Sequence, residues 1–238
     1  MIPFLIINDI SSKTVNGLLI QSLPPISKPK IRTSKEEIDG RDGDIVTPLG
    51  FAAYDKTVSI GLKGDYNVDD VISYFNSSGK VIFSSEIDRY YNFNIYDAID
   101  LDRLIRYRVA DVKMHVQPFK YDANEVEKTY SYTDVTEATI TARNLGNVYS
   151  KPTLTITGTG SISVYLNDTQ IFSISLDDTE QTIIIDVEQM NAYDTEGNYL
   201  NRLVVGDYDN FILNTGLNNI TISGSITSVS INKVSRWI

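Results

Sequence analysis

The sequence contains no cysteine, one histidine and one tryptophan among its 238 residues. Without cysteine, the protein has neither disulfide bonds nor thiolate chemistry, so its stability must come from packed cores and from association. The single histidine, His115, falls on the polar face of an expected strand. No Ser-His-Asp set, His-Glu-x-x-His run, phosphate-binding loop or dinucleotide glycine fingerprint is present. Hydrolysis by a pair of carboxylates needs only Asp or Glu, so composition does not exclude it. The pair Asp177 and Asp178, however, falls in an expected turn, where Asp is favoured for its hydrogen bonds to the backbone. The sequence therefore predicts no catalytic residue and no enzyme.

Long apolar runs and an excess of positive charge are also missing. No segment approaches the ~18 apolar residues that span a bilayer, and the first residues lack the basic start of a secretory signal. Residues 1–130 hold 16 Lys and Arg against 19 Asp and Glu, and residues 131–238 hold 5 against 12, which gives −3 and −7 of the total −10. Because affinity for phosphates comes from accumulated Lys and Arg, this charge argues against specific nucleic-acid binding. We expect no membrane association either.

Strand patterns dominate what is present. Ile, Val, Thr and Tyr are plentiful, and apolar residues often alternate with polar ones. Val112, Met114 and Val116 share one face of a half-buried strand, while Lys113 and His115 share the other. The segment 97–108 mixes acidic and basic residues, which we interpret as ion pairing across strands. The sequence predicts a mainly β protein.

One helix interrupts the strands of the first half. Asn67 can cap its start, Asp69 and Asp70 suit its positive N-terminal end, and Val71 and Phe75 belong to its apolar face. We expect this short helix to cover one face or one open end of a first β-sandwich.

The chain is predicted to form two domains, 1–130 and 131–238, because a polar stretch without clear period lies near residues 120–135. Beyond it, short strands follow one another at close spacing, with Asn167 and Asp168 among the turn residues. The expected strands are 153–158, 161–166, 170–176 and 181–187, with further strands around 220–222 and 229–231. This pattern is typical of a β-sandwich or jelly roll.

A glycine-flanked charged pair stands in the first domain just before a strand. Gly40 and Gly43 bracket Arg41 and Asp42. Since glycine enters positive φ without a Cβ penalty, two glycines three apart indicate a tight reversal of the chain. Arg41 and Asp42 would project from it, placed to bind each other or a neighbouring chain.

The order of residues around this turn resembles the signature of the distal tail proteins of long-tailed, non-contractile phages (siphophages), components of the tail tip or baseplate hub. In that family a Gly-Arg-Asp-Gly turn precedes a Tyr-Asp and a β-strand, as Tyr54 and Asp55 do here. The resemblance covers most of the chain and is most specific before residue 120. It continues at Ser73-Tyr74-Phe75, at Gly79-Lys80-Val81, at Asp88-Arg89-Tyr90-Tyr91 and at Gln117-Pro118-Phe119, and more loosely at Asn144-Leu145-Gly146-Asn147, at Gly216-Leu217-Asn218 and at Arg236-Trp237.

The resemblance implies a structural virion component at the distal end of the phage tail, made in the host cytoplasm. The first domain would form a homo-hexameric ring that joins the tail tube to the tail-tip hub and lets DNA pass, and the second would be a galectin-like sandwich. Implied partners are the tail tube protein, the tape-measure protein and the tail hub or receptor-binding proteins. As subunit-interface candidates we take the turn and one acidic-basic pair from segment 97–108: Gly40, Arg41, Asp42, Gly43, Asp102 and Arg106.

A galectin-like sandwich leaves carbohydrate binding open as an alternative function, in which the second domain recognises host cell-wall saccharide. Candidate contacts are Tyr193, Tyr199 and Tyr208, because sugars usually stack on aromatic rings. Two oxygen-rich clusters could hold calcium, but they are better interpreted as solvated loop acids: Asp97 with Asp100 and Asp102, and Asp207 with Asp209 and Asn210. We predict no metal and no cofactor. We expect the last residues, ending in Trp237-Ile238, to pack back on the first domain.

Overall fold

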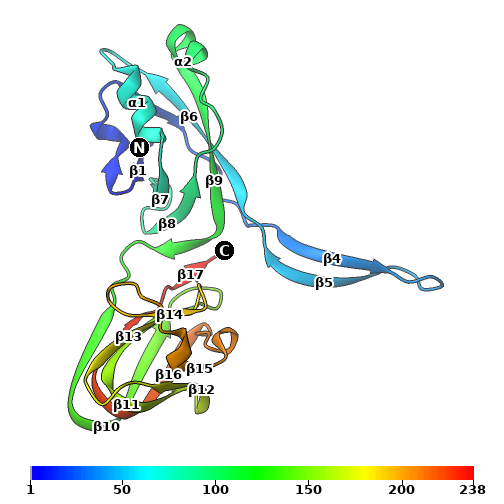
Figure 1. Ribbon diagram of the computed structural model, residues 1–238. Helices are drawn as coiled ribbons and strands as arrows, with labels where there is room; N and C mark the ends of the chain where they lie inside the picture. Colours follow the sequence, from blue (N-terminus) through cyan, green and yellow to red (C-terminus); the bar gives the residue numbers. More distant parts are fainter. Residues whose placement is uncertain (1) are drawn as a thin grey trace. The chain divides into compact units, whose positions relative to one another are not determined.

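The structure, a computed structural model, describes residues 2–238, without the side chain at position 134. The chain is mainly β, with 56% strand and 10% helix, which confirms the predicted fold class. It divides into two compact units: unit 1 holds the residues up to Ala123 together with Ile238, and unit 2 holds Asn124–Trp237 (Figure 1). Each unit has its own hydrophobic core. Within the described residues, no helix is long and apolar enough to cross a membrane.

Unit 1 is built on a curled antiparallel sheet with the strand order β2-β1-β7-β8-β9-β6-β3. Its centre is β9, where Val112, Met114 and Val116 are all fully buried, as the alternation of the sequence predicts. Polar residues between them face outward. The strands are β1 (Leu5–Ile7), β2 (Ile10–Ser11), β3 (Leu18–Ser22), β6 (Tyr54–Leu62), β7 (Ser78–Phe83), β8 (Arg89–Asn94) and β9 (Val109–Asp122), and a 3-10 turn, η1, spans Ser12–Thr14.

The predicted helix is present as α1 (Val68–Phe75), and its capping residue is the one that the sequence indicates. The Asn67 side chain accepts a hydrogen bond from the Asp69 N–H at 3.0 Å. Val71 and Phe75 are buried in the core of unit 1. A second helix, α2 (Leu101–Tyr107), lies where ion-paired strands were expected. The prediction of a single helix was therefore wrong, because Asp100 caps a helix of two turns there.

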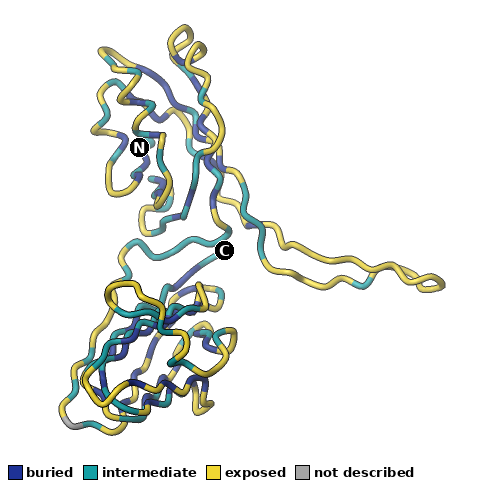
Figure 2. Tube along the Cα trace, in the orientation of Figure 1, coloured by how far each residue is buried: buried dark blue, intermediate teal, exposed yellow. Residues whose placement is uncertain are grey.

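A two-stranded arm projects from unit 1 (Figure 1). Its strands, β4 (Ile31–Glu37) and β5 (Asp44–Phe51), pair only with each other, and none of their residues is buried (Figure 2). An isolated hairpin is marginally stable in water, so an arm of this length normally gains stability from a partner. At its root, the Ala52 N–H donates to the Lys30 carbonyl at 2.8 Å.

Two side chains of β6 hold the segment that leads into the arm. The Lys56 ammonium donates to the Pro25 carbonyl at 2.9 Å, and the Tyr54 hydroxyl donates to the Ser27 carbonyl at 3.3 Å. Lys56 is only 4% exposed, and its burial lowers its pKa. The direction in which the arm leaves unit 1 is therefore set by specific hydrogen bonds from the sheet.

Unit 2 is a sandwich whose strands follow the order β10-β16-β11-β12-β15, with β13 paired to β11 and β14 paired to β13. Phe172, Ile174 and Leu176 enter its core while Ser173 and Ser175 face away, as expected from their alternation. The strands are β10 (Lys128–Asn144), β11 (Thr153–Leu166), β12 (Thr169–Ser175), β13 (Gln181–Asp186), β14 (Asn191–Tyr193), β15 (Val204–Gly206) and β16 (Gly216–Asn232), with 3-10 turns η2 (Asn201–Leu203) and η3 (Tyr208–Asn210).

Two long strands replace pairs of short ones expected from the sequence. β11 and β16 each run without interruption through segments that were predicted as two separate strands. Their register shifts near Gly158 and between Thr159 and Ser163. Gly224, at φ +140°, allows the close approach, since a Cβ there would lie 2.6 Å from the Ser161 carbonyl oxygen. These glycines bend continuous strands instead of ending them.

The two ends of unit 2 lie side by side. Lys128 at the start of β10 pairs with Ile231 near the end of β16. Glu125 joins the same ends, because its carboxylate accepts from the Ser235 N–H at 2.6 Å and pairs with the Lys233 ammonium at 2.8 Å. The chain therefore enters and leaves unit 2 at one place.

Candidate functional site

The predicted Gly-Arg-Asp-Gly turn forms the tip of the arm. Gly40 and Gly43 have φ of +83° and +76°, so both occupy the left-handed region that favours glycine. No atom lies within 4 Å of where their Cβ atoms would be, so the space beside both glycines is open. Arg41 and Asp42 are exposed there. The structure thus presents this charged pair at the far end of the hairpin.

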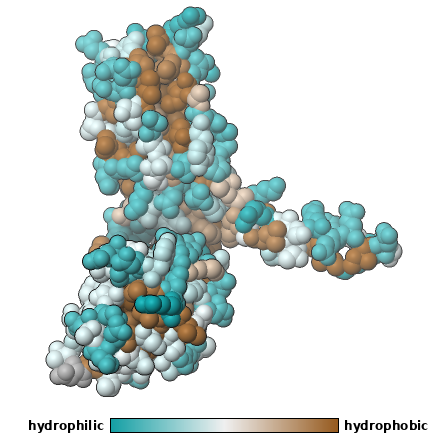
Figure 3. Space-filling view, in the orientation of Figure 1, coloured by the Kyte–Doolittle hydropathy of each residue, from teal (hydrophilic) through white to brown (hydrophobic). Residues whose placement is uncertain are grey.

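The outer half of the arm is acidic, and the arm also exposes apolar side chains. Residues 35–44 contain five acidic and two basic residues, a net charge of −3, and the ion pair found there joins Lys35 to Asp44 at 3.0 Å. Ile38, Val46 and Leu49 are 49–56% exposed. Figure 3 shows hydrophobic groups among polar ones along the arm. Such a surface, with two open strand edges, is suited to contact another protein chain.

Helix α2 is a second exposed surface of unit 1. The Asp100 carboxylate caps it by accepting from the Arg103 N–H at 2.9 Å, and Leu104 anchors it in the core. The helix exposes Ile105, Arg106 and Tyr107, with Tyr107 74% exposed. Asp102 is exposed one turn before Arg106, yet no ion pair joins the two within the part of the chain that the structure describes. We call Leu101, Asp102, Ile105, Arg106 and Tyr107 the α2 surface.

The arm and the α2 surface adjoin opposite ends of the same strand pair. In the β6–β9 register, Tyr54 beside the arm root pairs with Val116, whereas Gly61 pairs with Val109, which follows α2. Seven residues of extended strand span roughly 23 Å. The two interface candidates from the sequence, Arg41–Asp42 and Asp102–Arg106, therefore lie in different places within one subunit. They do not form a single patch.

The outward face of β6 and β9 carries an ion cluster around Asp55. Its carboxylate lies 2.8 Å from His115 Nδ1 and 3.0 Å from the Lys113 ammonium, which also pairs with Asp97 at 3.1 Å. Hydrogen bonds from His115 and then Lys113 hold the pKa of Asp55 below its usual value, and those of Asp55 and Asp97 raise the pKa of Lys113. All these groups are exposed, so they define the polarity of this face and contribute little to stability.

The acidic clusters considered for calcium have structural roles. Asp100 caps α2, Asp97 pairs with Lys113, and Asp207 accepts from the Asp209 N–H and the Asn210 side chain at 2.9 and 2.8 Å. Over residues 2–238, as far as their side chains are described, no three His, Asp or Glu residues are grouped to hold a metal ion.

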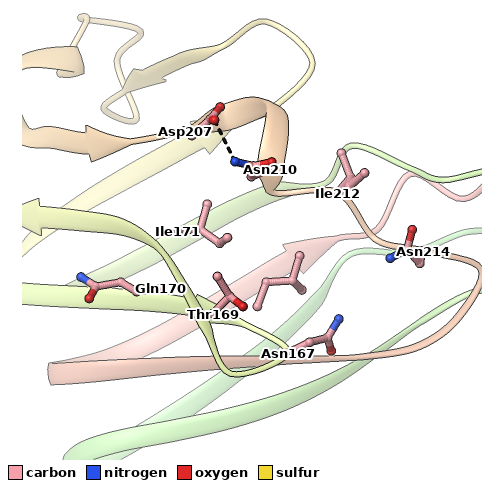
Figure 4. Close-up of a pocket in the computed structure, with 9 residues that line it drawn as sticks. Asn167, Thr169, Gln170, Ile171, Asp207, Asn210, Ile212 and Asn214 are labelled. Carbon is pink, nitrogen blue, oxygen red and sulfur yellow. Dashed lines mark hydrogen bonds between the residues drawn. The ribbon is translucent and has the colours of Figure 1, made fainter.

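Unit 2 contains a groove of 420 Å³ between the β11–β12 turn and the segment around η3 (Figure 4). We call it the polar groove. Leu166, Ile171 and Ile212 supply its apolar part. The other lining residues all carry an amide, a hydroxyl or a carboxylate: Asn167, Thr169, Gln170, Asp207, Asn210 and Asn214. No sequence pattern indicates this groove, because its two walls are distant in the chain.

The three tyrosines suggested for sugar stacking do not line the polar groove. Tyr208 packs its ring against Phe172 at a centroid distance of 5.0 Å, and burial raises its pKa. Tyr193 and Tyr199 face each other across an isolated bridge, with Tyr199 72% exposed.

Comparison with known proteins finds no matching family model and no matching curated protein. Among solved structures, the chain has the fold of a hub protein of a phage adsorption apparatus. That structure is the SPP1 Dit (gp 19.1) protein, described as a paradigm of the hub adsorption apparatus in phages infecting Gram-positive bacteria. It aligns with a TM-score of 0.67 and 16% identity over 98% of this chain and 99% of that chain.

Two further similar structures are of the phage p2 baseplate in its activated conformation. The one with strontium gives a TM-score of 0.49 and 10% identity over 98% of both chains, and the one with calcium gives 0.49 and 9% over 97% of both. The fold implied by the resemblance to distal tail proteins is confirmed by the SPP1 Dit alignment.

Proposed function

We propose that the protein is a structural component of the tail tip of a long-tailed phage. In this proposal unit 1 forms a homo-hexameric ring that joins the tail tube to the tail-tip hub, and DNA passes through its channel. The fold shared with SPP1 Dit supports the proposal over almost the whole chain. The observation that supports the ring itself is the arm, which has no buried residue and whose strands pair only with each other.

A closed ring requires a head-to-tail interface, in which one patch meets a different patch on the next subunit. The arm and the α2 surface meet this requirement, because they adjoin opposite ends of the β6–β9 pair. Their charges are of opposite sign: the outer arm carries −3, whereas helix α2 carries Arg103 and Arg106 against Asp102, a net charge of +1. Apolar groups such as Val46 and Leu49 would supply most of the affinity, and the charges would fix the register.

Unit 2 in this proposal holds neighbouring tail-tip or receptor-binding proteins. The tail tube and tape-measure proteins are the partners proposed for the ring. The role is architectural and needs no bond-making chemistry. His115, the single histidine of the chain, is hydrogen-bonded to Asp55 on an exposed strand face, and no serine–histidine contact is found among the described residues.

Negative-stain electron microscopy of the purified chain, alone and mixed with the other tail-tip proteins of its virion, tests the proposal directly. Six-fold rings with a central hole are the expected result. The proposal would be contradicted if both preparations showed only separate particles, even at high protein concentration. A mixture is included because some rings assemble only with their partners.

Charge reversal at the arm tip tests the contact between the arm and the α2 surface. Asp42→Arg is expected to weaken the ring about tenfold, because it would place an arginine near Arg106 of the next subunit. Arg106→Asp alone should also weaken it, and the double variant should recover at least about 1 kcal/mol. Light scattering across a dilution series measures the effect. Glu196→Arg, a charge reversal at an exposed position of unit 2, is the control and should leave assembly unchanged. The contact would be disproved if the double variant lost as much assembly free energy as the two single variants together.

A further inference from the structure

We propose that the polar groove of unit 2 binds a neutral saccharide, a function separate from ring assembly. The groove is concave, and its volume of 420 Å³ falls within the range of about 300–1,000 Å³ typical of small-ligand sites. Its walls come from two segments that backbone hydrogen bonds hold in place. It is therefore a preformed cavity, and its lining indicates the class of ligand.

The lining favours a ligand rich in hydroxyl groups. Figure 4 shows Asp207 and Asn210 on one side, with Ile212 beside Asn210, and Thr169 and Asn167 on the other. Ile171 lies between the two sides. An amide side chain offers both donors and an acceptor, which matches a sugar hydroxyl that donates and accepts. The isoleucines offer an apolar surface on which the C–H face of a pyranose can lie.

Several of these polar groups are available to a ligand. Among the described residues, the side chains of Thr169, Gln170 and Asn214 make no hydrogen bond. The side-chain oxygen of Asn167, Oδ1, accepts from the Asn219 backbone N–H at 2.9 Å. The side-chain NH₂ group of Asn167 is therefore left to donate to a ligand in the groove. A ligand could thus bind without breaking the hydrogen bonds that hold the walls.

The walls are fixed before any ligand arrives. Asn167 and Asp168 turn the chain with φ of +48° and +68°. Buried Asn218 holds the backbone of Asn214, accepting from its N–H at 3.0 Å and donating to its carbonyl at 2.8 Å. Pre-organisation of this kind lowers the entropic cost of binding.

Electrostatics distinguish a neutral saccharide from a phosphate-bearing one. No lysine or arginine lines the groove, whereas Asp207 does, and Asp168 and Asp209 adjoin lining residues in the chain. The nearby Asp209 is paired with the Lys151 ammonium at 3.8 Å, but Lys151 does not line the groove. An anionic ligand such as a glycerol phosphate polymer would therefore meet repulsion from Asp207 without a cation in the lining to bind it. The lack of an aromatic ring in the lining indicates weak binding to a single sugar unit, so a polysaccharide contacted by several copies at once would bind through avidity.

Saturation-transfer NMR on the full-length protein tests this site, with glucose, galactose, rhamnose and N-acetylglucosamine as probes and with glycerol and glycerol phosphate for comparison. At least one sugar is expected to give a signal that both comparison compounds lack. The variant Thr169→Val/Asn214→Ala should weaken that binding about tenfold, since it removes two hydrogen-bonding side chains. Thr136→Val, at an exposed threonine on β10 outside the groove, is the matched control and should bind as the unmodified protein does.

Three results would overturn the proposal: no response to any of the four sugars, an equal response to glycerol or glycerol phosphate, or an unchanged response in the double variant. Both altered residues are exposed, so the double variant should melt at the temperature of the unmodified protein. Ring formation in electron micrographs should be the same in all these variants. Failure here is thus distinguishable from failure of the ring proposal.

Discussion

Removing the arm is expected to abolish ring assembly while leaving unit 1 folded. The change replaces residues 31–51 by an Asn-Gly turn between Lys30 and Ala52. These two residues already share a backbone hydrogen bond of 2.8 Å, so a tight turn can close the chain without strain. Since the arm adds no buried residue to the core, the melting temperature should change little. Loss of the whole contact should weaken self-association on the order of a thousandfold or more.

Electron microscopy and light scattering report the assembly, and circular dichroism reports the fold. A shorter change, in which residues 40–43 alone become Asn-Gly, separates the tip from the strands of the arm. It should weaken the rings less than the full deletion does, because Val46 and Leu49 remain. Rings of normal stability without the arm would exclude it as the main contact.

Phe172→Ala is expected to have the largest effect on stability, and it should be confined to unit 2. The Phe172 side chain is fully buried, with its ring 5.4 Å from that of Phe211 and 5.0 Å from that of Tyr208. Truncating a buried phenylalanine costs about 3–5 kcal/mol, because transfer energy is lost and a cavity remains. That cost should lower the melting transition of unit 2 by at least about 10 °C.

Calorimetry measures the effect, and two transitions are expected because each unit has its own core. The transition of unit 1 should stay in place. Val205→Ala, an apolar truncation at a position 71% exposed on β15, is the control and should change neither transition appreciably. Equal displacement of both transitions by Phe172→Ala would show that the two units unfold together.

Local patterns in the sequence were enough to predict much of the fold. The alternation around Met114 identifies a half-buried strand, Asn67 marks the start of α1, and Gly40 and Gly43 mark the arm tip. Each of these signals depends only on residues that are close in the sequence: the strand on an alternation of period two, the helix on its capping residue, and the arm tip on glycines that adopt positive φ. The fold class followed from them.

What the sequence failed to predict depends on contacts between distant segments. Helix α2 has two turns and a single buried residue, Leu104, so no apolar period distinguishes it from a strand. β11 and β16 were each predicted as two shorter strands, because a glycine that bends a strand gives the same local signal as a glycine that ends one. The polar groove could not be foreseen at all, since Thr169 and Asn214 meet only after the sandwich has formed.

The meeting of both ends of unit 2 at one place has a mechanical consequence. Lys128 at the start of β10 and Ile231 near the end of β16 are paired neighbours. A force that pulls the two ends of unit 2 apart would therefore separate β10 from β16 by breaking their hydrogen bonds one after another. Such peeling resists tension far less than sliding strands past each other does. We therefore expect unit 2 to open at low force when it is pulled by its two ends.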